Sequence, residues 1–232
     1  TYGQISQYAD NLARNLKDLG LVTKRSYDFE GDHKIIGIFS RNCSEWMITD
    51  VACQRDSTTS VTFYNTLGDK SFDHIFEQTN VSTVCVSNDG VKNLIKYYKE
   101  FNFQSLKNVI LYDLTLYTDE KMFKQLEETG LKIYSFKSLI EDKNSKTELV
   151  LSKPETLLTL CYTSGTTSLP KGVKITQNMM FCDSDSIEDS GLILCKNDTH
   201  LSYLPLAHIM ERLVILTMMY KGGLSCFIAT GD

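Results

Sequence analysis

The chain has 232 residues, of which 42% are hydrophobic and 23% charged, with only 3 prolines. This length is sufficient for one substantial hydrophobic core, and the composition is that of a folded globular protein. The formal charge of -5 argues against a nucleic-acid-binding domain, which carries a basic face.

The 7 cysteines are scattered, with neither the close spacing of a metal quartet nor a C-x-x-C redox pair. Several lie inside apolar runs, as Cys85 and Cys161 do, so we predict buried, reduced thiols in a protein that faces the cytosol. In that setting we interpret the glycosylation sequons as coincidences, at Asn42, Asn80 and Asn197.

The sequence contains no secretory signal and no uninterrupted apolar run of the roughly 20 residues that a membrane span requires. The chain begins at Thr1 rather than at a methionine and ends at Asp232, directly after an apolar segment. We therefore expect a piece of a longer protein.

Hydrophobic periodicity predicts an opening helix that ends at Gly20. The residues expected on its inward face are Ile5, Tyr8, Leu12, Leu16 and Leu19. Apolar runs predict strands at 34–39, 60–64, 83–86, 109–112 and 132–136. Further helices are predicted after Asn42, after Asp69, and over 91–98 and 120–129, with Gly130 ending the last of these.

Two of these helices have candidate caps. Asn42 stands three residues before Glu45, which is the spacing of a capping box, and Asp69 precedes an apolar helical pattern that buries Phe72, Ile75 and Phe76. We predict that the Asn42 and Asp69 side chains cap the helices that follow them.

Regular alternation of strand and helix predicts an α/β fold, with layered parallel sheets and flanking helices. Residues 141–153 are polar and are interpreted as a surface connection. This divides the chain into a first α/β portion, 1–140, and a second portion, 154–232.

The segment 157–176 is the most informative about function. An apolar strand leads into a ten-residue loop with five hydroxyl side chains, two glycines and one lysine, and strand character returns at 173–175. Gly165 and Gly172 allow several backbone N–H groups to point at one anion. Charge-assisted hydrogen bonds contribute about 1.5–3 kcal/mol each. The residues predicted to bind a polyphosphate are therefore Thr163, Ser164, Gly165, Thr166, Thr167, Ser168, Lys171 and Gly172.

A Walker-type phosphate loop is the alternative for this composition. It requires lysine directly after the second glycine, followed by a helix. Here Lys171 precedes Gly172 and a strand follows, so we reject it.

The run from Tyr162 to Gly172, YTSGTTSLPKG, resembles the phosphate-binding motif of the adenylate-forming superfamily, which comprises acyl-CoA synthetases, luciferases and peptide-synthetase adenylation domains. Two positions depart from that motif: Ser168 stands where glycine is usual, and Gln177 where histidine is common. The extra side chain at Ser168 would slow the movement of the loop or alter its affinity for the phosphates.

Three other blocks resemble the long-chain acyl-CoA synthetases within that superfamily: 37–46 (GIFSRNCSEW), 64–68 (YNTLG) and 201–212 (LSYLPLAHIMER). Together with the loop they extend over nearly the whole chain. The resemblance implies the N-terminal AMP-binding domain of a long-chain fatty acid–CoA ligase, incomplete here and without its C-terminal domain.

In the last block a strand ends before Pro205 and a helix is predicted from His208 to Tyr220. His208 is therefore placed near a strand terminus, where α/β proteins bind ligands. With the resemblance, His208 and Lys171 become the predicted catalytic residues, and His208 positions the carboxylate and the adenylate. Glu211 and Arg212 form an alternative structural pair that would fix the helix start. The apolar stretch 213–220 is interpreted as core, with the lining of an acyl tunnel as the alternative.

The resemblance implies ATP, Mg2+ and coenzyme A as cofactor and co-substrates, with a fatty acid as the acid partner. It also implies peripheral association with the cytosolic face of a membrane such as the endoplasmic reticulum. The adenine, magnesium and ribose contacts and the catalytic lysine of the family are expected beyond Asp232. Two alternatives stay open: a luciferase-like or shorter-chain ligase, and a nucleotide-binding relative without turnover.

Overall fold

The computed structural model describes residues 1–27, 31–64, 68–112, 120–163 and 169–228. Its helices are α1 (Tyr2–Asp18), α2 (Ser44–Arg55), α3 (Asp69–Thr79), α4 (Asn88–Phe101), α5 (Glu120–Glu127), α6 (Phe136–Glu141), α7 (Gln177–Asp189) and α8 (Ile209–Lys221). Its strands are β1 (Lys24–Ser26), β2 (Asp32–Phe39), β3 (Thr58–Phe63), β4 (Thr83–Val86), β5 (Asn108–Leu111), β6 (Lys132–Ser135), β7 (Leu157–Thr163), β8 (Lys171–Thr176), β9 (Thr199–Ser202) and β10 (Leu224–Phe227).

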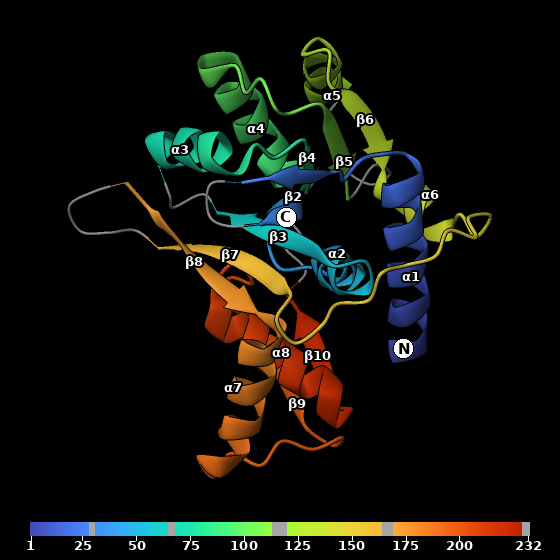
Figure 1. Ribbon diagram of the computed structural model, residues 1–232, viewed down its shortest axis with the longest axis vertical. Helices are drawn as coiled ribbons and strands as arrows, with labels where there is room; N and C mark the ends of the chain where they lie inside the picture. The colour runs from blue at the N-terminus through green and yellow to red at the C-terminus, as the bar shows by residue number, and fades with distance from the viewer. Residues whose placement is uncertain (28–30, 65–67, 113–119, 164–168, 229–232) are drawn as a thin grey trace.

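Most of the strands form one large sheet of order β6-β5-β4-β2-β3-β7-β8, with β1 paired to β2 (Figure 1). All neighbours from β6 to β7 are parallel, while β8 pairs antiparallel with β7 at one edge and β1 pairs antiparallel with the first residues of β2. A second sheet consists of the parallel pair β9 and β10, which lies with α7 and α8 in the lower part of Figure 1. The predicted α/β class with parallel sheets and flanking helices is confirmed.

Helices cover both faces of the large sheet. On one face α3, α4 and α5 pack against alternate residues of the central strands, such as Phe39 and Val84. On the other face α1, α2 and α6 pack against the residues between them, such as Ile38 and Cys85. Burial on both faces explains why these strands appear in the sequence as continuous apolar runs rather than as alternating patterns.

Several local predictions were wrong at element ends. Helix α3 begins at Asp69 itself, with Gly68 as its N-cap and no side-chain cap. Helix α2 has Cys43 as N-cap, also without a side-chain bond, so Asn42 does not form a capping box. The strand predicted over 132–136 ends at Ser135, and Phe136 begins the short helix α6.

The opening helix ends one residue earlier than its apolar pattern, because Leu19 is its C-cap and is half exposed. The prediction of buried thiols holds for Cys53 and Cys85 but is wrong for Cys182 and Cys195, which are exposed; all seven cysteines are free. Helix α7 and strand β10 were not predicted. No described helix has the length and apolar character needed to cross a membrane.

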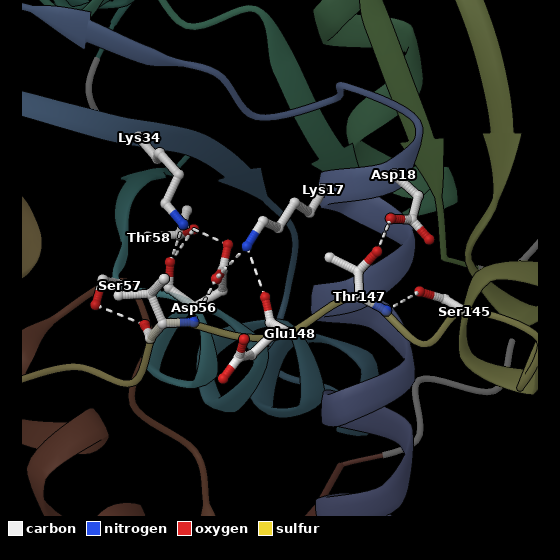
Figure 2. Close-up of polar contacts among 10 residues, drawn as sticks. Lys17, Asp18, Lys34, Asp56, Ser57, Thr58, Ser145, Thr147 and Glu148 are labelled. Carbon is white, nitrogen blue, oxygen red and sulfur yellow. Dashed lines mark hydrogen bonds and ion pairs between the residues drawn. The ribbon is translucent and has the colours of Figure 1, made fainter.

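The polar segment 142–156 lacks regular structure, but it is attached firmly to the first portion (Figure 2). Asp56, whose side chain is only 3% exposed, accepts a hydrogen bond from the Val150 N–H at 2.9 Å and forms ion pairs with Lys34 and Lys17. Lys17 also donates to the Glu148 carbonyl at 2.6 Å. Because β7 then pairs with β3, this connection does not separate two sheets: the strand before the loop belongs to the first portion's sheet.

A second buried carboxylate joins α2 to α8. The Arg212 guanidinium donates two hydrogen bonds to Asp50, one of them from Nε at 2.9 Å, and a third to the Ser60 hydroxyl at 3.1 Å. Arg212 also lies over the Trp46 ring, 5.4 Å from its centroid. Burial raises the pKa of Asp50, and the Arg212 charge partly offsets this rise. Glu211 pairs instead with His200 at 2.8 Å, so the predicted pairing of Glu211 with Arg212 is replaced by two separate pairs.

We expect Asp56→Ala to destabilise the chain by about 2–3 kcal/mol, because the Val150 N–H and two lysines lose a buried acceptor. Limited proteolysis should then cut within 142–153 sooner than in the wild type. Asp32→Ala is the matched control: its pair with Lys24 is exposed, so the expected change in urea unfolding is below about 1 kcal/mol. Equal effects of the two substitutions would contradict the anchoring role of Asp56.

Arg212→Met should destabilise the chain by about 3–5 kcal/mol, since it leaves Asp50 buried and unpaired. The folded pKa of Asp50 is already raised, so stability falls as pH rises from the unfolded pKa through the folded one. Loss of the guanidinium raises that pKa further, so urea unfolding should show a larger deficit at about pH 8 than at about pH 5. The double variant Arg212→Met, Asp50→Leu should recover most of the stability, and a deficit independent of pH would contradict this account.

Candidate functional site

The predicted phosphate loop connects two antiparallel strands. β7 and β8 pair with Thr163 opposite Lys171 and Tyr162 opposite Gly172. The strand after the loop is therefore confirmed, which supports rejection of a Walker-type loop. Thr163, Lys171 and Gly172 are exposed at the end of this hairpin where the loop joins β7 to β8. The predicted residues Ser164, Gly165, Thr166, Thr167 and Ser168 lie outside the described residues.

Gly172 has a steric reason rather than a conformational one, because its φ is not positive. A Cβ at this position would lie 3.0 Å from Tyr162 Cζ. Burial raises the pKa of Tyr162 to about 12, so its hydroxyl remains protonated and donates to Gln78 Oε1 at 2.9 Å. The Tyr162 carbonyl in turn accepts from the Tyr64 hydroxyl at 3.2 Å. These contacts hold the base of the hairpin against β3 and α3.

His208 is the N-cap of α8 rather than a residue of its first turn. Its Nδ1 accepts a hydrogen bond from the Met210 N–H at 3.3 Å, and its side chain is exposed. In the neutral ring this arrangement leaves the proton on Nε2, which can then act as a donor. A cap that also presents a donor suits the predicted role of orienting a carboxylate.

The residue before His208 connects the two predicted parts of the site. The Ala207 carbonyl accepts from the Thr62 hydroxyl of β3 at 3.3 Å and lies 3.8 Å from Cys161 Sγ of β7. Cys161 is two residues before Thr163, so the residue that precedes His208 contacts the strand that leads into the loop. The structure thus brings His208 to the strand that carries the loop.

Burial raises the pKa of the Cys161 thiol, which disfavours the reactive thiolate form.

A cavity of about 370 Å3 opens at the same edge of the sheet. Its walls include Phe39, Asn42, Tyr64, Gly90, Tyr203 and Ala207. Ligand pockets for small molecules have volumes of roughly 300–1,000 Å3, and this one is lined mainly by apolar side chains.

The position of this cavity follows from the strand order. β2 and β4 are neighbours, although β3, which comes between them in the chain, lies on the other side of β2. The helix after β2 covers one face of the sheet and the helix after β4 covers the other. Open α/β sheets bind ligands beyond the carboxyl ends of strands at such a reversal. Residues from both strand ends, Ser40 and Asp89 among them, line the cavity.

Sequence reasoning missed several residues that build this site, among them Thr62, Tyr64 and Cys161. Their positions at or near the carboxyl ends of β3 and β7 were the available signal. The stretch 213–220 behaves as core: Leu213, Ile215 and Met218 are buried among other apolar side chains. Within the described residues, no three His, Cys, Asp or Glu side chains gather to hold a metal ion.

Curated proteins with related sequences match most of this chain. The chain is 33% identical to fatty acyl-CoA synthetase A of Dictyostelium discoideum over 96% of the chain and 31% of that protein. It is 32% identical to long-chain-fatty-acid–CoA ligase 5 of Rattus norvegicus over 96% of the chain and 32% of that protein. The chain therefore spans about a third of the length of these curated relatives.

Solved structures share the fold at lower identity. The adenylation domain of a carboxylate reductase from Mycobacterium chelonae superposes with a TM-score of 0.80 at 19% identity, over 100% of this chain and 36% of that one. A red-emitting luciferase from Phrixothrix hirtus gives 0.76 at 17% identity, over 100% of this chain and 41% of that one. The family model described as AMP-binding enzyme matches residues 1–232. The chain therefore belongs to the AMP-binding enzyme family.

Proposed function

We propose that the protein containing this chain activates long-chain fatty acids with ATP and transfers them to coenzyme A. The observation that supports this most is the convergence of the β7–β8 hairpin and the start of α8 through the Ala207 carbonyl. The similarity to curated fatty acyl-CoA synthetases favours a fatty acid as the substrate.

In the first half-reaction a carboxylate oxygen of the fatty acid attacks the α-phosphorus of ATP. A P–O bond forms to give acyl-AMP, and the bond to the β-phosphate breaks to release pyrophosphate. We assign Lys171, with the backbone and hydroxyl groups of Thr163 to Ser168 and Gly172, to the β- and γ-phosphates. Donors placed in advance stabilise the charge that builds on the leaving pyrophosphate.

His208 is assigned to the carboxylate. Its Nε2–H can donate a hydrogen bond to a carboxylate oxygen and hold the acid in line with the α-phosphorus, without forming a covalent bond to it. In the second half-reaction the sulfur of coenzyme A attacks the acyl carbon and AMP leaves. The cavity at the β2–β4 reversal offers space for an apolar part of one of these substrates.

Mg2+ accompanies ATP in the function that the family resemblance implies. The described residues supply no cluster of ligands for it, so no step above is assigned to a metal ligand of this chain. We propose that the remaining length of the protein provides the metal, adenine and ribose contacts and the small C-terminal domain. The hydrophobic acyl chain of the substrate and the family resemblance favour a location of the protein at the cytosolic face of a membrane such as the endoplasmic reticulum.

The 232-residue chain alone is expected to form no acyl-CoA, because it spans only about a third of its relatives. The full-length protein should release pyrophosphate with ATP and fatty acids, and a panel of acids of increasing length measures its preference. A preference for short or aromatic acids would favour another adenylate-forming ligase. Acyl-CoA synthesis by the isolated chain would contradict the proposed division of the active site.

Lys171→Ala in the full-length protein should raise the KM for ATP about tenfold to hundredfold, the equivalent of one charge-assisted hydrogen bond. Fatty-acid binding should change little. Lys174→Ala removes the same charge three positions along the exposed strand β8 and should leave both parameters nearly unchanged. Equal weakening of ATP and fatty-acid use by Lys171→Ala would count against its assignment to the phosphates.

A further inference from the structure

Asn42 lies just after β2, at the reversal of strand order, and its side chain is fully engaged with a distant segment. Its Nδ2 donates to Ser202 Oγ at 2.8 Å and to the Leu204 carbonyl at 2.6 Å. Its Oδ1 accepts from the Leu206 N–H at 2.7 Å. One side chain therefore holds the segment 202–206 at three points, using both amide hydrogens and the amide oxygen.

These bonds matter because the segment has little other support. Residues 203–208 belong to no helix or strand, and Tyr203 is 68% exposed. Within the described residues, the Leu204 carbonyl and the Leu206 N–H have no hydrogen-bond partner besides Asn42. Leu206 is only 1% exposed, so its N–H would be buried without a partner if Asn42 were removed.

The segment leads directly to the capping histidine. Leu206 packs in the core on the α2 face of the sheet, Ala207 rests on Thr62 and Cys161, and the His208 N–H donates to the Pro205 carbonyl at 2.8 Å. The path of the backbone into α8 is thus set by side chains from β3, β7 and the end of β2.

We propose that Asn42 is a positioning residue of the adenylation site, which acts through the segment 202–206 to place His208. This rests on the proposed function, in which His208 orients the carboxylate. Asn42 also lines the cavity at the β2–β4 reversal, but in this assignment it donates no hydrogen bond to a substrate, since its amide hydrogens are already used within the chain. In the sequon Asn42-Cys43-Ser44, the asparagine nitrogen that would carry a glycan already donates two hydrogen bonds within the chain.

The test uses the full-length protein and the variants Asn42→Ala, His208→Ala and the double variant, assayed by fatty-acid-dependent pyrophosphate release. Asn42→Ala should lower kcat about tenfold or more, because displacements near 1 Å cost up to about a hundredfold, while the KM for ATP stays within about twofold. In the His208→Ala background, Asn42→Ala should lower kcat almost no further, because Asn42 acts only by placing the His208 side chain, which is already absent. Equal effects in both backgrounds would overturn the proposal.

A second measurement does not depend on activity. Hydrogen–deuterium exchange should be faster in peptides covering 202–208 of Asn42→Ala than of the wild type, and unchanged exchange would also overturn the proposal. Asn144→Ala is the control, since that side chain is exposed and makes no hydrogen bond within the described residues. If Asn42→Ala does not fold, Asn42→Asp replaces it: it keeps the acceptor for Leu206 but loses the bond to the Leu204 carbonyl. An inactive wild type with faster exchange in the variant would count against the proposed function and not against the role of Asn42.

Discussion

The buried pair between Asp50 and Arg212 joins two segments that the chain places far apart. Neither charge is exposed to water, and the guanidinium is further held by Ser60 and by the face of Trp46. Such a pair adds little to stability compared with an apolar substitute, but removing either partner leaves the other charge buried without a counter-charge. It therefore sets how α8, which begins at His208, lies against the large sheet.

The same stretch of chain, from the end of β2 through α2 to β3, holds most of the second half in place. Asn42 holds 202–206, Asp50 holds Arg212, Asp56 holds the segment around Val150, and Thr62 holds Ala207. The connection 142–156 is consequently part of the folded unit. The site is assembled on this frame, since both β7 and the start of α8 are placed by it.

Much of the fold was predictable because parallel strands buried on both faces appear as short apolar runs, as 83–86 does. The strands on either side of the loop were also predictable, whereas phosphate binding by the loop and the catalytic role of His208 stay predictions. The failures have a common physical origin. A capping box at Asn42 is a local inference, whereas its real partners lie 160 residues and more away. Glu211 and Arg212 were likewise predicted to pair because they are adjacent in sequence. In the fold, Glu211 pairs with His200 and Arg212 pairs with the buried Asp50. Helix α7 was missed because its sequence mixes polar and apolar residues without a clear face.

The distance in sequence between Asp50 and its partner has a consequence for synthesis on the ribosome. Arg212 follows Asp50 by 162 residues, so α2 can pack on the growing sheet long before its carboxylate finds a counter-charge. Protein chains tend to fold from the N-terminus as they emerge, at about 5–20 residues per second. For that interval, on the order of ten seconds, Arg212 is not yet available to Asp50. The buried pair between α2 and α8 can therefore form only after α8 has been made.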